Sequence, residues 1–129
     1  MAGSGGATGT GPGGGTGTAG DVGEALLDRA LHLVQIGRVE AAYPLITEAL
    51  RVDPEDNYAL LVLARCYQRQ NRWSDSLTIL DMLVPRAPAS VQVHRNRSIA
   101  LRQLGRIPEA LAAAEQARTL APDDASNEV

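Results

Sequence analysis

One short phrase of the sequence recurs at a fixed interval. The stretch ALRVDPED ends at Asp56, and related endings occur later as LVPRAPAS and ARTLAPDD. Their prolines, Pro54, Pro88 and Pro122, lie 34 residues apart. A fixed period of this length is typical of chains built from one repeated supersecondary unit. The period divides the sequence into the units 23–56, 57–90 and 91–124.

Apolar and small residues inside each unit have helical spacing. Residues at i, i+4 and i+7 lie on one face of a helix, and the middle unit contains two such stripes in succession. The stripes are Leu60, Ala64 and Tyr67, then Ser76, Leu80 and Leu83. Each unit therefore predicts two helices, and the chain as a whole predicts an all-α fold.

Helix-breaking residues lie between the stripes at equivalent places. Gly37, Asn71 and Gly105 stand where the first helix of each unit is expected to stop. Each repeat proline lies where the second helix gives way to the next unit.

Three further prolines fall inside or beside the second helices. Pro44 should remove one backbone hydrogen bond and bend its helix, and Pro85 should end its helix about a turn early. Pro108 falls at a helix start, where its missing N–H costs little.

The helix pair of 34 residues resembles the tetratricopeptide repeat, whose pattern is W-x2-L-G-x2-Y, then A-x3-F, then P. The middle unit matches through Leu60, Leu63, Ala64, Tyr67, Ser76, Leu80 and Pro88. The first unit offers Leu26, Ala30, Leu33, Gly37, Ala42, Ile46, Ala49 and Pro54, and the third offers Ser98, Leu101, Gly105, Ala110, Ala114, Ala117 and Pro122. Arg29 and Arg97 replace the usual leucine, and His94 replaces the first large apolar residue of the third unit. The resemblance implies an α-solenoid of three antiparallel helix pairs.

The domain organisation follows from the repeat and from glycine content. Residues 1–20 are rich in glycine and lack large apolar residues after Met1, so we expect a disordered tail or linker there. Residues 21–124 form the predicted repeat domain, and residues 125–129 a polar tail. The glycine-rich tail lacks the features of a secretion signal, and no apolar run approaches the length of a membrane span.

In proteins that resemble this one, the first helix of each unit lines a concave groove. The corresponding positions predict a peptide groove, apolar at its first-unit end and rich in arginine and amides beyond. Its predicted residues are Leu27, Leu31, Val34, Tyr58, Leu61, Arg65, Gln68, Arg69, Gln92, Arg95, Ile99 and Arg102. A family variant clamps a chaperone carboxylate with lysine, asparagine and arginine, but Leu27, Leu31, Val62, Gln92 and Asn96 occupy those positions here. That clamp is absent.

Charge is distributed unevenly along the chain. Residues 57–106 carry eight arginines against two acids, whereas residues 21–56 carry three arginines against eight acids and residues 107–129 one against five. The arginines of the predicted groove either bind a ligand or form a solvated face that pairs partly with Asp75, Asp81 or the acidic flanks. The net charge of −3 and the scarcity of aromatic residues argue against nucleic acid as the partner.

Catalytic and cofactor chemistry has no support in the sequence. Cys66 is the only cysteine and lacks a partner at catalytic spacing, so we interpret it as a buried thiol. His32 and His94 are far apart and have no ligand cluster near them, which gives no basis for a metal site. The glycine runs lack the ending of a phosphate-binding loop. We therefore expect a non-enzyme without cofactor.

These observations favour a scaffold that holds an acidic peptide segment with aliphatic anchors in its groove. The alternative is a structural module that dimerises or continues a longer solenoid, because Leu111, Leu120 and residues 112–114 should leave the last helix partly uncovered. A single cysteine fits a cytoplasmic location or the cytosolic part of an anchored parent protein, and the bias toward arginine, alanine and glycine suggests a bacterial source with a GC-rich genome.

Overall fold

The computed structural model describes residues 19–122 of the chain. The chain divides into two compact units, Met1–Ala59 and Leu60–Val129. From here on, the first unit and the second unit mean these two segments, and the 34-residue segments are called repeats. The predicted glycine-rich tail lies outside the described residues, except that Ala19 and Gly20 already belong to the first helix. The predicted polar tail, residues 125–129, also lies outside them.

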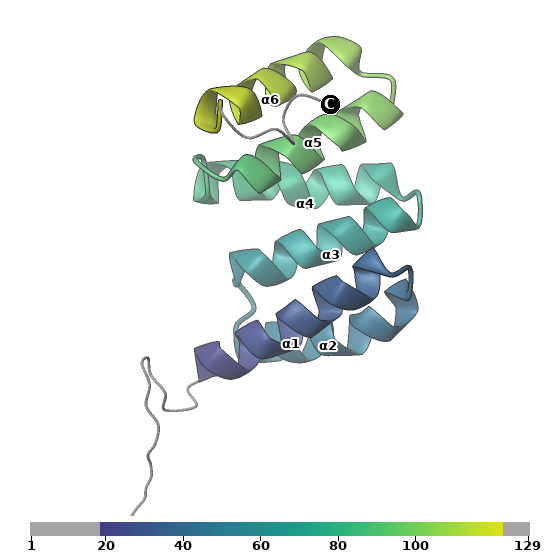
Figure 1. The fold of residues 1–129 in the computed structure, drawn as a ribbon, viewed down its shortest axis with the longest axis vertical. Helices are drawn as coiled ribbons and strands as arrows, with labels where there is room; N and C mark the ends of the chain where they lie inside the picture. The colour runs from purple at the N-terminus through teal and green to yellow at the C-terminus, as the bar shows by residue number, and fades with distance from the viewer. Residues whose placement is uncertain (1–18, 123–129) are drawn as a thin grey trace, which may run out of the picture. The chain divides into compact units, whose positions relative to one another are not determined.

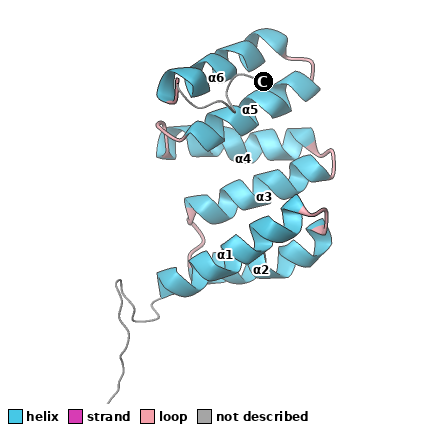
Figure 2. Cartoon of the chain, viewed as in Figure 1, coloured by secondary structure: helices cyan, strands magenta, loops and turns pink. Residues whose placement is uncertain are grey.

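The described residues form α-helices joined by short loops, and no strand occurs among residues 19–122 (Figures 1 and 2). The helices are α1 (Ala19–Gln35), α2 (Val39–Val52), α3 (Asn57–Arg69), α4 (Trp73–Arg86), α5 (Val91–Gln103) and α6 (Ile107–Leu120). The second helix of each pair starts 34 residues after the previous one, at Val39, Trp73 and Ile107. The prediction of an all-α fold made of helix pairs is confirmed.

The three tight turns within the pairs share one hydrogen-bonding pattern. In the first turn Gly37 has a positive φ of 87°. The Arg38 N–H donates to the Leu33 carbonyl at 2.8 Å, and the Gly37 N–H donates to the Val34 carbonyl at 3.1 Å. Asn71 and Gly105 have φ values of 61° and 80°, and the bonds recur from Arg72 to Tyr67, Asn71 to Gln68, Arg106 to Leu101 and Gly105 to Arg102. A left-handed residue followed by these two bonds satisfies carbonyls that a helix end leaves without partners, so the predicted breakers end their helices in the same way.

Hydrogen bonds also stabilise the loops between successive helix pairs. The Asp56 carboxylate accepts the Tyr58 N–H at 2.9 Å at the start of α3. The Ser90 hydroxyl accepts the Val93 N–H at 3.2 Å at the start of α5. Short polar side chains thus cap donors that the first helical turn leaves unpaired.

Pro85 affects its helix less than the sequence predicts. Pro85 does not shorten α4, which ends at Arg86 in the same repeat position as α2. The prediction was wrong because Pro85 lies in the last turn, where the Ala87 N–H still donates to the Leu83 carbonyl at 2.8 Å. Pro44 lies within α2, which continues to Val52, and Pro108 lies in the first turn of α6 as predicted.

In the first unit α1 and α2 form a pair with a small, apolar core. Its fully or almost fully buried side chains lie on one face of each helix. They are Leu27, Ala30 and Val34 of α1, and Val39, Ala42, Ile46 and Ala49 of α2.

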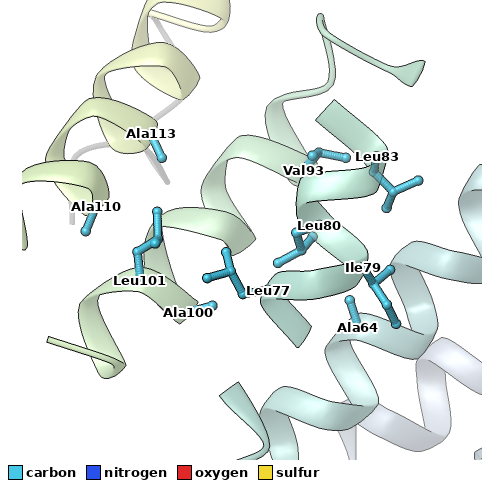
Figure 3. Close-up of a cluster of buried hydrophobic side chains, with 10 residues drawn as sticks. All are labelled: Ala64, Leu77, Ile79, Leu80, Leu83, Val93, Ala100, Leu101, Ala110 and Ala113. Atoms are coloured by element: carbon cyan, nitrogen blue, oxygen red, sulfur yellow. The ribbon is translucent and has the colours of Figure 1, made fainter. Parts of the chain in front are cut away.

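In the second unit four helices share one core (Figure 3). Its buried residues are Ala64 of α3, Leu77, Ile79, Leu80 and Leu83 of α4, Val93, Ala100 and Leu101 of α5, and Ala110 and Ala113 of α6. Leu60 and Tyr67 pack against this cluster, and Ser76 of the predicted α4 stripe is buried as well. Trp73 begins α4 and also packs on the core.

Polar residues of α5 replace part of the apolar packing in the third repeat. His94 is buried, and its Nε2 lies 2.8 Å from the Pro88 carbonyl oxygen. The Ser98 hydroxyl donates to the Ala110 carbonyl on α6 at 2.9 Å. Arg97 donates through Nε to the Asp81 carboxylate on α4 at 2.6 Å. The departures from the apolar pattern are therefore used in hydrogen bonds between neighbouring helices and loops.

Candidate functional site

A face rich in arginine is formed within the second unit by α3 and α5. On α3 the side chains recur at helical spacing over two turns, and on α5 they recur over three. Buried residues of both helices point into the core, while this set is half-exposed or exposed. We define the arginine face as Leu61, Arg65, Gln68, Arg69, Gln92, Arg95, Ile99 and Arg102.

Gln68 fixes how the two helices of this face lie together. Its side-chain amide donates to the main-chain carbonyl of Asn96 at 3.0 Å. The Asn96 side chain is buried and donates to the Gln92 carbonyl of its own helix at 2.8 Å. The sequence predicts Gln68 as a groove residue, whereas its side-chain N–H group bonds the backbone of α5.

The acids of the second unit pair with arginines outside this face. Residues 60–122 contain four acids. Asp75 and Asp81 bond Arg72 and Arg97 at 2.9 and 2.6 Å, and Glu109 and Glu115 bond Arg106 and Arg118 at 2.7 and 2.6 Å. Asp75 and Asp81, which the sequence offers as partners for the groove arginines, are thus engaged elsewhere.

Three arginines of the face are not neutralised by an acidic side chain within residues 19–122. Arg65, Arg69 and Arg102 form no ion pair within residues 19–122. Each guanidinium offers several donors in a planar fork that fits a carboxylate. The face can therefore bind a chain that carries more than one acidic group.

Tyr58, a predicted groove residue that belongs to the first unit, has acidic side chains around it. The Tyr58 hydroxyl donates to the Asp28 carboxylate at 2.7 Å. Burial, this hydrogen bond and the nearby charges of Asp28, Glu24 and Asp56 raise the pKa of Tyr58 to about 12. Tyr58 is thus held neutral and oriented by an acid of its own unit.

Two predicted groove residues of α1 do not lie on the surface. Leu27 and Val34 have 0% exposure and belong to the core. The expectation that they belong to an exposed stripe was wrong, because the buried face of α1 is wider than the single stripe assumed. Leu31, between them in the sequence, is half-exposed.

The remaining reactive side chains are placed for packing. Cys66 is buried, and its burial raises the pKa of the thiol to about 11, which leaves it protonated at neutral pH. No cluster of potential metal ligands occurs in the part of the chain that the structure describes. Among the same helices, none has the length and apolar character of a membrane span.

The comparison with family profiles decides the identity of the fold. Residues 33–98 match a profile described as tetratricopeptide repeat, and residues 91–124 match a second profile with the same description. The chain belongs to the tetratricopeptide repeat family. Members of this family generally mediate interactions between proteins.

Solved structures with tetratricopeptide repeats have the same fold. A complex of PcrH with the chaperone binding region of PopB has 20% identity and a TM-score of 0.72, and the match covers 87% of this chain and 90% of that one. The first repeat domain of Spaghetti (RPAP3), bound to the HSP90 peptide SRMEEVD, has 17% identity and a TM-score of 0.74, with 84% and 86% covered.

A third similar structure is longer than the present chain. It is residues 41 to the end of MamA from Desulfovibrio magneticus RS-1, with 18% identity and a TM-score of 0.70. The match covers 81% of this chain but only 59% of that one. No curated protein matches the chain. These likenesses establish the tetratricopeptide repeat fold.

Proposed function

We propose that this protein is a scaffold whose arginine face binds a segment of another protein that carries acidic groups and one or two aliphatic residues. The observation that carries the proposal is the set of three arginines, Arg65, Arg69 and Arg102, that lack an ion pair within residues 19–122. Guanidinium groups bind carboxylates with charge-assisted hydrogen bonds, which are stronger than neutral ones. No catalytic step belongs to this function.

The aliphatic preference rests on two residues of the same face. Leu61 lies one turn before Arg65 on α3, and Ile99 lies one turn after Arg95 on α5. Both side chains are half-exposed, so a ligand can cover what remains of their apolar surface. A segment with acids spaced around one aliphatic residue therefore fits the face better than a uniformly acidic one.

The family supports binding of a peptide rather than of a small molecule. Two structures with this fold hold a protein segment, namely a region of PopB and the peptide SRMEEVD. The latter contains three acidic residues. The positions of the chaperone-carboxylate clamp are occupied here by other residues, such as Leu31 and Gln92, so we expect recognition through side-chain carboxylates.

Selection from a random peptide library tests this function. The full chain serves as bait, and enriched peptides are labelled for fluorescence anisotropy. We expect enrichment of Asp and Glu around Leu, Ile or Val. Replacing Arg65, Arg69, Arg95 and Arg102 with Gln should weaken binding at least about tenfold, because several charged hydrogen bonds are lost. Circular dichroism should show unchanged helicity.

A matched variant controls for net charge. Arg29, Arg51, Arg106 and Arg118 are exposed and lie outside the face, so R29Q/R51Q/R106Q/R118Q, which removes the same four charges, should retain binding. Wild-type binding by the variant with the four face substitutions would show that the face is assigned wrongly.

A second candidate function is self-association through α6. Ile107 and Leu111 lie one turn apart on this helix and are 46% and 66% exposed. Adjacent exposed apolar side chains are unusual unless another surface covers them. Light scattering over a range of concentrations tests this function. A dimer that dissociates in L111Q would favour it, and a monomer throughout would remove it.

A further inference from the structure

The three arginines without an ion pair are spaced along the arginine face in a way that the helix geometry determines. Arg65 and Arg69 are four residues apart on α3, which places them about 6 Å apart along the helix axis at 1.5 Å per residue. Arg102 belongs to α5, so its place in the row depends on how α5 lies against α3.

The hydrogen bond from Gln68 to the Asn96 carbonyl sets this register. Helix α4 reverses the chain between α3 and α5, so these two helices run in the same direction (Figure 1). Arg69 is one residue beyond Gln68, or about 1.5 Å along the axis, and Arg102 is six residues beyond Asn96, or about 9 Å. Arg102 therefore lies about 7.5 Å beyond Arg69 along the face.

Intervals of about 6 and 7.5 Å match the repeat of an extended chain. Side chains on one side of an extended chain recur at every second residue, about 6.4–6.8 Å apart. Acids at positions i, i+2 and i+4 of an extended ligand can therefore meet Arg65, Arg69 and Arg102 in turn. A helical ligand reaches similar intervals with acids at i, i+4 and i+9, so a second observation has to decide between the two forms.

The Gln68 amide favours the extended form. Its Nε2 bonds Asn96, whereas its Oε1 accepts no hydrogen bond within residues 19–122. The side chain is half-exposed and lies between Arg65 and Arg69 in the row, so a ligand can reach this oxygen. An extended ligand offers backbone N–H groups to such an acceptor, while a helical ligand has used most of them internally.

Leu61 continues the same row beyond its first arginine. It lies one turn before Arg65, about 6 Å along α3, and it is half-exposed. On an extended ligand this distance again corresponds to two residues. An aliphatic side chain two positions beyond the acid at Arg65 can therefore cover Leu61.

We propose that the arginine face binds its partner as an extended segment, with acids at three alternate positions and an aliphatic residue at the next alternate position. The acids meet Arg65, Arg69 and Arg102 in this order, the aliphatic residue covers Leu61, and Gln68 Oε1 accepts a backbone N–H of the ligand. The inference rests on the proposed function and adds to it the form of the ligand and the spacing of its acids.

Three synthetic peptides test the spacing against the full chain. All have blocked ends, the same length, and the same composition of one leucine, three glutamates and neutral polar residues. The glutamates are at i, i+2 and i+4 in the first peptide, at i, i+1 and i+2 in the second, and at i, i+4 and i+9 in the third. Each peptide is made in both sequence directions, and its tighter-binding direction is used.

Fluorescence anisotropy measures the three affinities. The first peptide should bind about two- to fivefold more tightly than the others, because an extended chain with either of the other spacings can pair with only two of the three arginines. Equal affinities would overturn the proposal. Tightest binding by the third peptide would also overturn it, since that result indicates a helical ligand.

Paired substitutions identify which acid meets which arginine. Changing the middle glutamate of the first peptide to Gln should weaken its binding to the wild type about two- to fivefold, and should have no further effect on R69Q. Because Arg69 is in the middle of the row, this holds whichever way the ligand runs. R118Q, a variant at an exposed position outside the face, should respond as the wild type does. Loss of the effect in R65Q or R102Q instead of R69Q would show that the register is wrong.

Backbone N-methylation of the ligand tests the role of Gln68. Each of the two amides between the acids at Arg65 and Arg69 is methylated in turn, which removes its N–H. One of the two methylated peptides should bind the wild type several-fold more weakly than the parent peptide, and Q68A should remove this difference. Circular dichroism checks that Q68A is folded. An equal loss with the wild type and Q68A, or no loss with either peptide, would contradict the assigned role of Gln68.

The failure of this proposal can be told apart from the failure of the proposed function. If library selection enriches acidic peptides without alternate spacing and the three synthetic peptides bind equally, the arginine face binds acids but the extended register is wrong. If no acidic peptide binds the full chain, the proposed function and the register are both wrong.

Discussion

The amide of Gln68 on α3 donates a 3.0 Å hydrogen bond to the Asn96 carbonyl on α5. This bond joins helices that are separated by the whole of α4 in the sequence. We expect Q68A to lower the free energy of unfolding by about 0.5–1.5 kcal/mol, the usual contribution of such a bond. Urea denaturation measures the change. The free energy of unfolding of Q92A, a variant at an exposed position of the same face, should stay within about 0.5 kcal/mol of the wild type. If Q68A and Q92A lose the same amount of stability, the Gln68 bond is not formed.

Replacing glycine with alanine should change the stability of the protein in opposite directions at Gly105 and Gly23. Gly105 has a φ of 80°, and no atom lies within 4 Å of the position that a Cβ would occupy. G105A should therefore destabilise the protein by about 1–2 kcal/mol through backbone strain alone. Gly23 also has no atom within 4 Å of that position but lies inside α1, so G23A should stabilise the protein by about 0.5–1 kcal/mol. Thermal unfolding that gives both variants the same sign would contradict this prediction.

Two buried or partly buried serines should also respond in opposite directions. The Ser76 hydroxyl is fully buried and has no hydrogen-bond partner among the described residues, whereas the Ser98 hydroxyl bonds the Ala110 carbonyl. We expect S76A to raise the free energy of unfolding by about 1 kcal/mol, because an unsatisfied polar group is removed from the core. S98A should lower it by a similar amount. Chemical denaturation of the two variants beside the wild type gives both values.

Tyr58 should ionise at a higher pH than an ordinary tyrosine, which the absorbance of tyrosinate reports. Its folded-state pKa of about 12 lies above the ordinary value of 10. The stability that it contributes is therefore complete below about pH 10 and is lost as the pH rises toward 12. Y58F should remove the step near pH 12 from the absorbance titration. A titration curve of Y58F that keeps this step would show that another tyrosine is responsible.

Cys66 should report the opening of the second unit. The buried thiol has a pKa of about 11, so both access and the thiolate fraction limit its reaction with a thiol reagent. We expect labelling of the native chain to be many times slower than labelling in urea. Rapid modification of the native protein would show that the core around α3 is open.

The sequence is sufficient to predict the elements but not their side-chain partners. The 34-residue spacing of Gly37, Asn71 and Gly105 locates the ends of three helices, since a left-handed residue is a local requirement. Helical spacing places Leu27 on the surface, although it is buried. A stripe identified from periodicity has an uncertain width, and one residue changes the direction of a side chain by about 100°.

The sequence around a residue does not predict which residue of another helix it contacts. Gln68 and Asn96 are 28 residues apart, and Tyr58 and Asp28 are 30 apart, in neither case at the repeat interval. Such pairs depend on how far one helix is shifted and rotated against another, which is decided by packing of the whole core. The arginine face, by contrast, can be predicted from sequence because it needs only helical spacing and an excess of charge. Its ligand stays a prediction.

The three matching turn closures have a consequence for how the chain acquires its structure. Each closure ties a carbonyl to an N–H only five residues further on, so every hairpin of helices can be initiated without contacts from distant segments. Chains dominated by such local contacts fold quickly, and repeat proteins can nucleate at any repeat and propagate to the next. During synthesis, the pair of α1 and α2 can therefore begin to form while the ribosome is still translating α5.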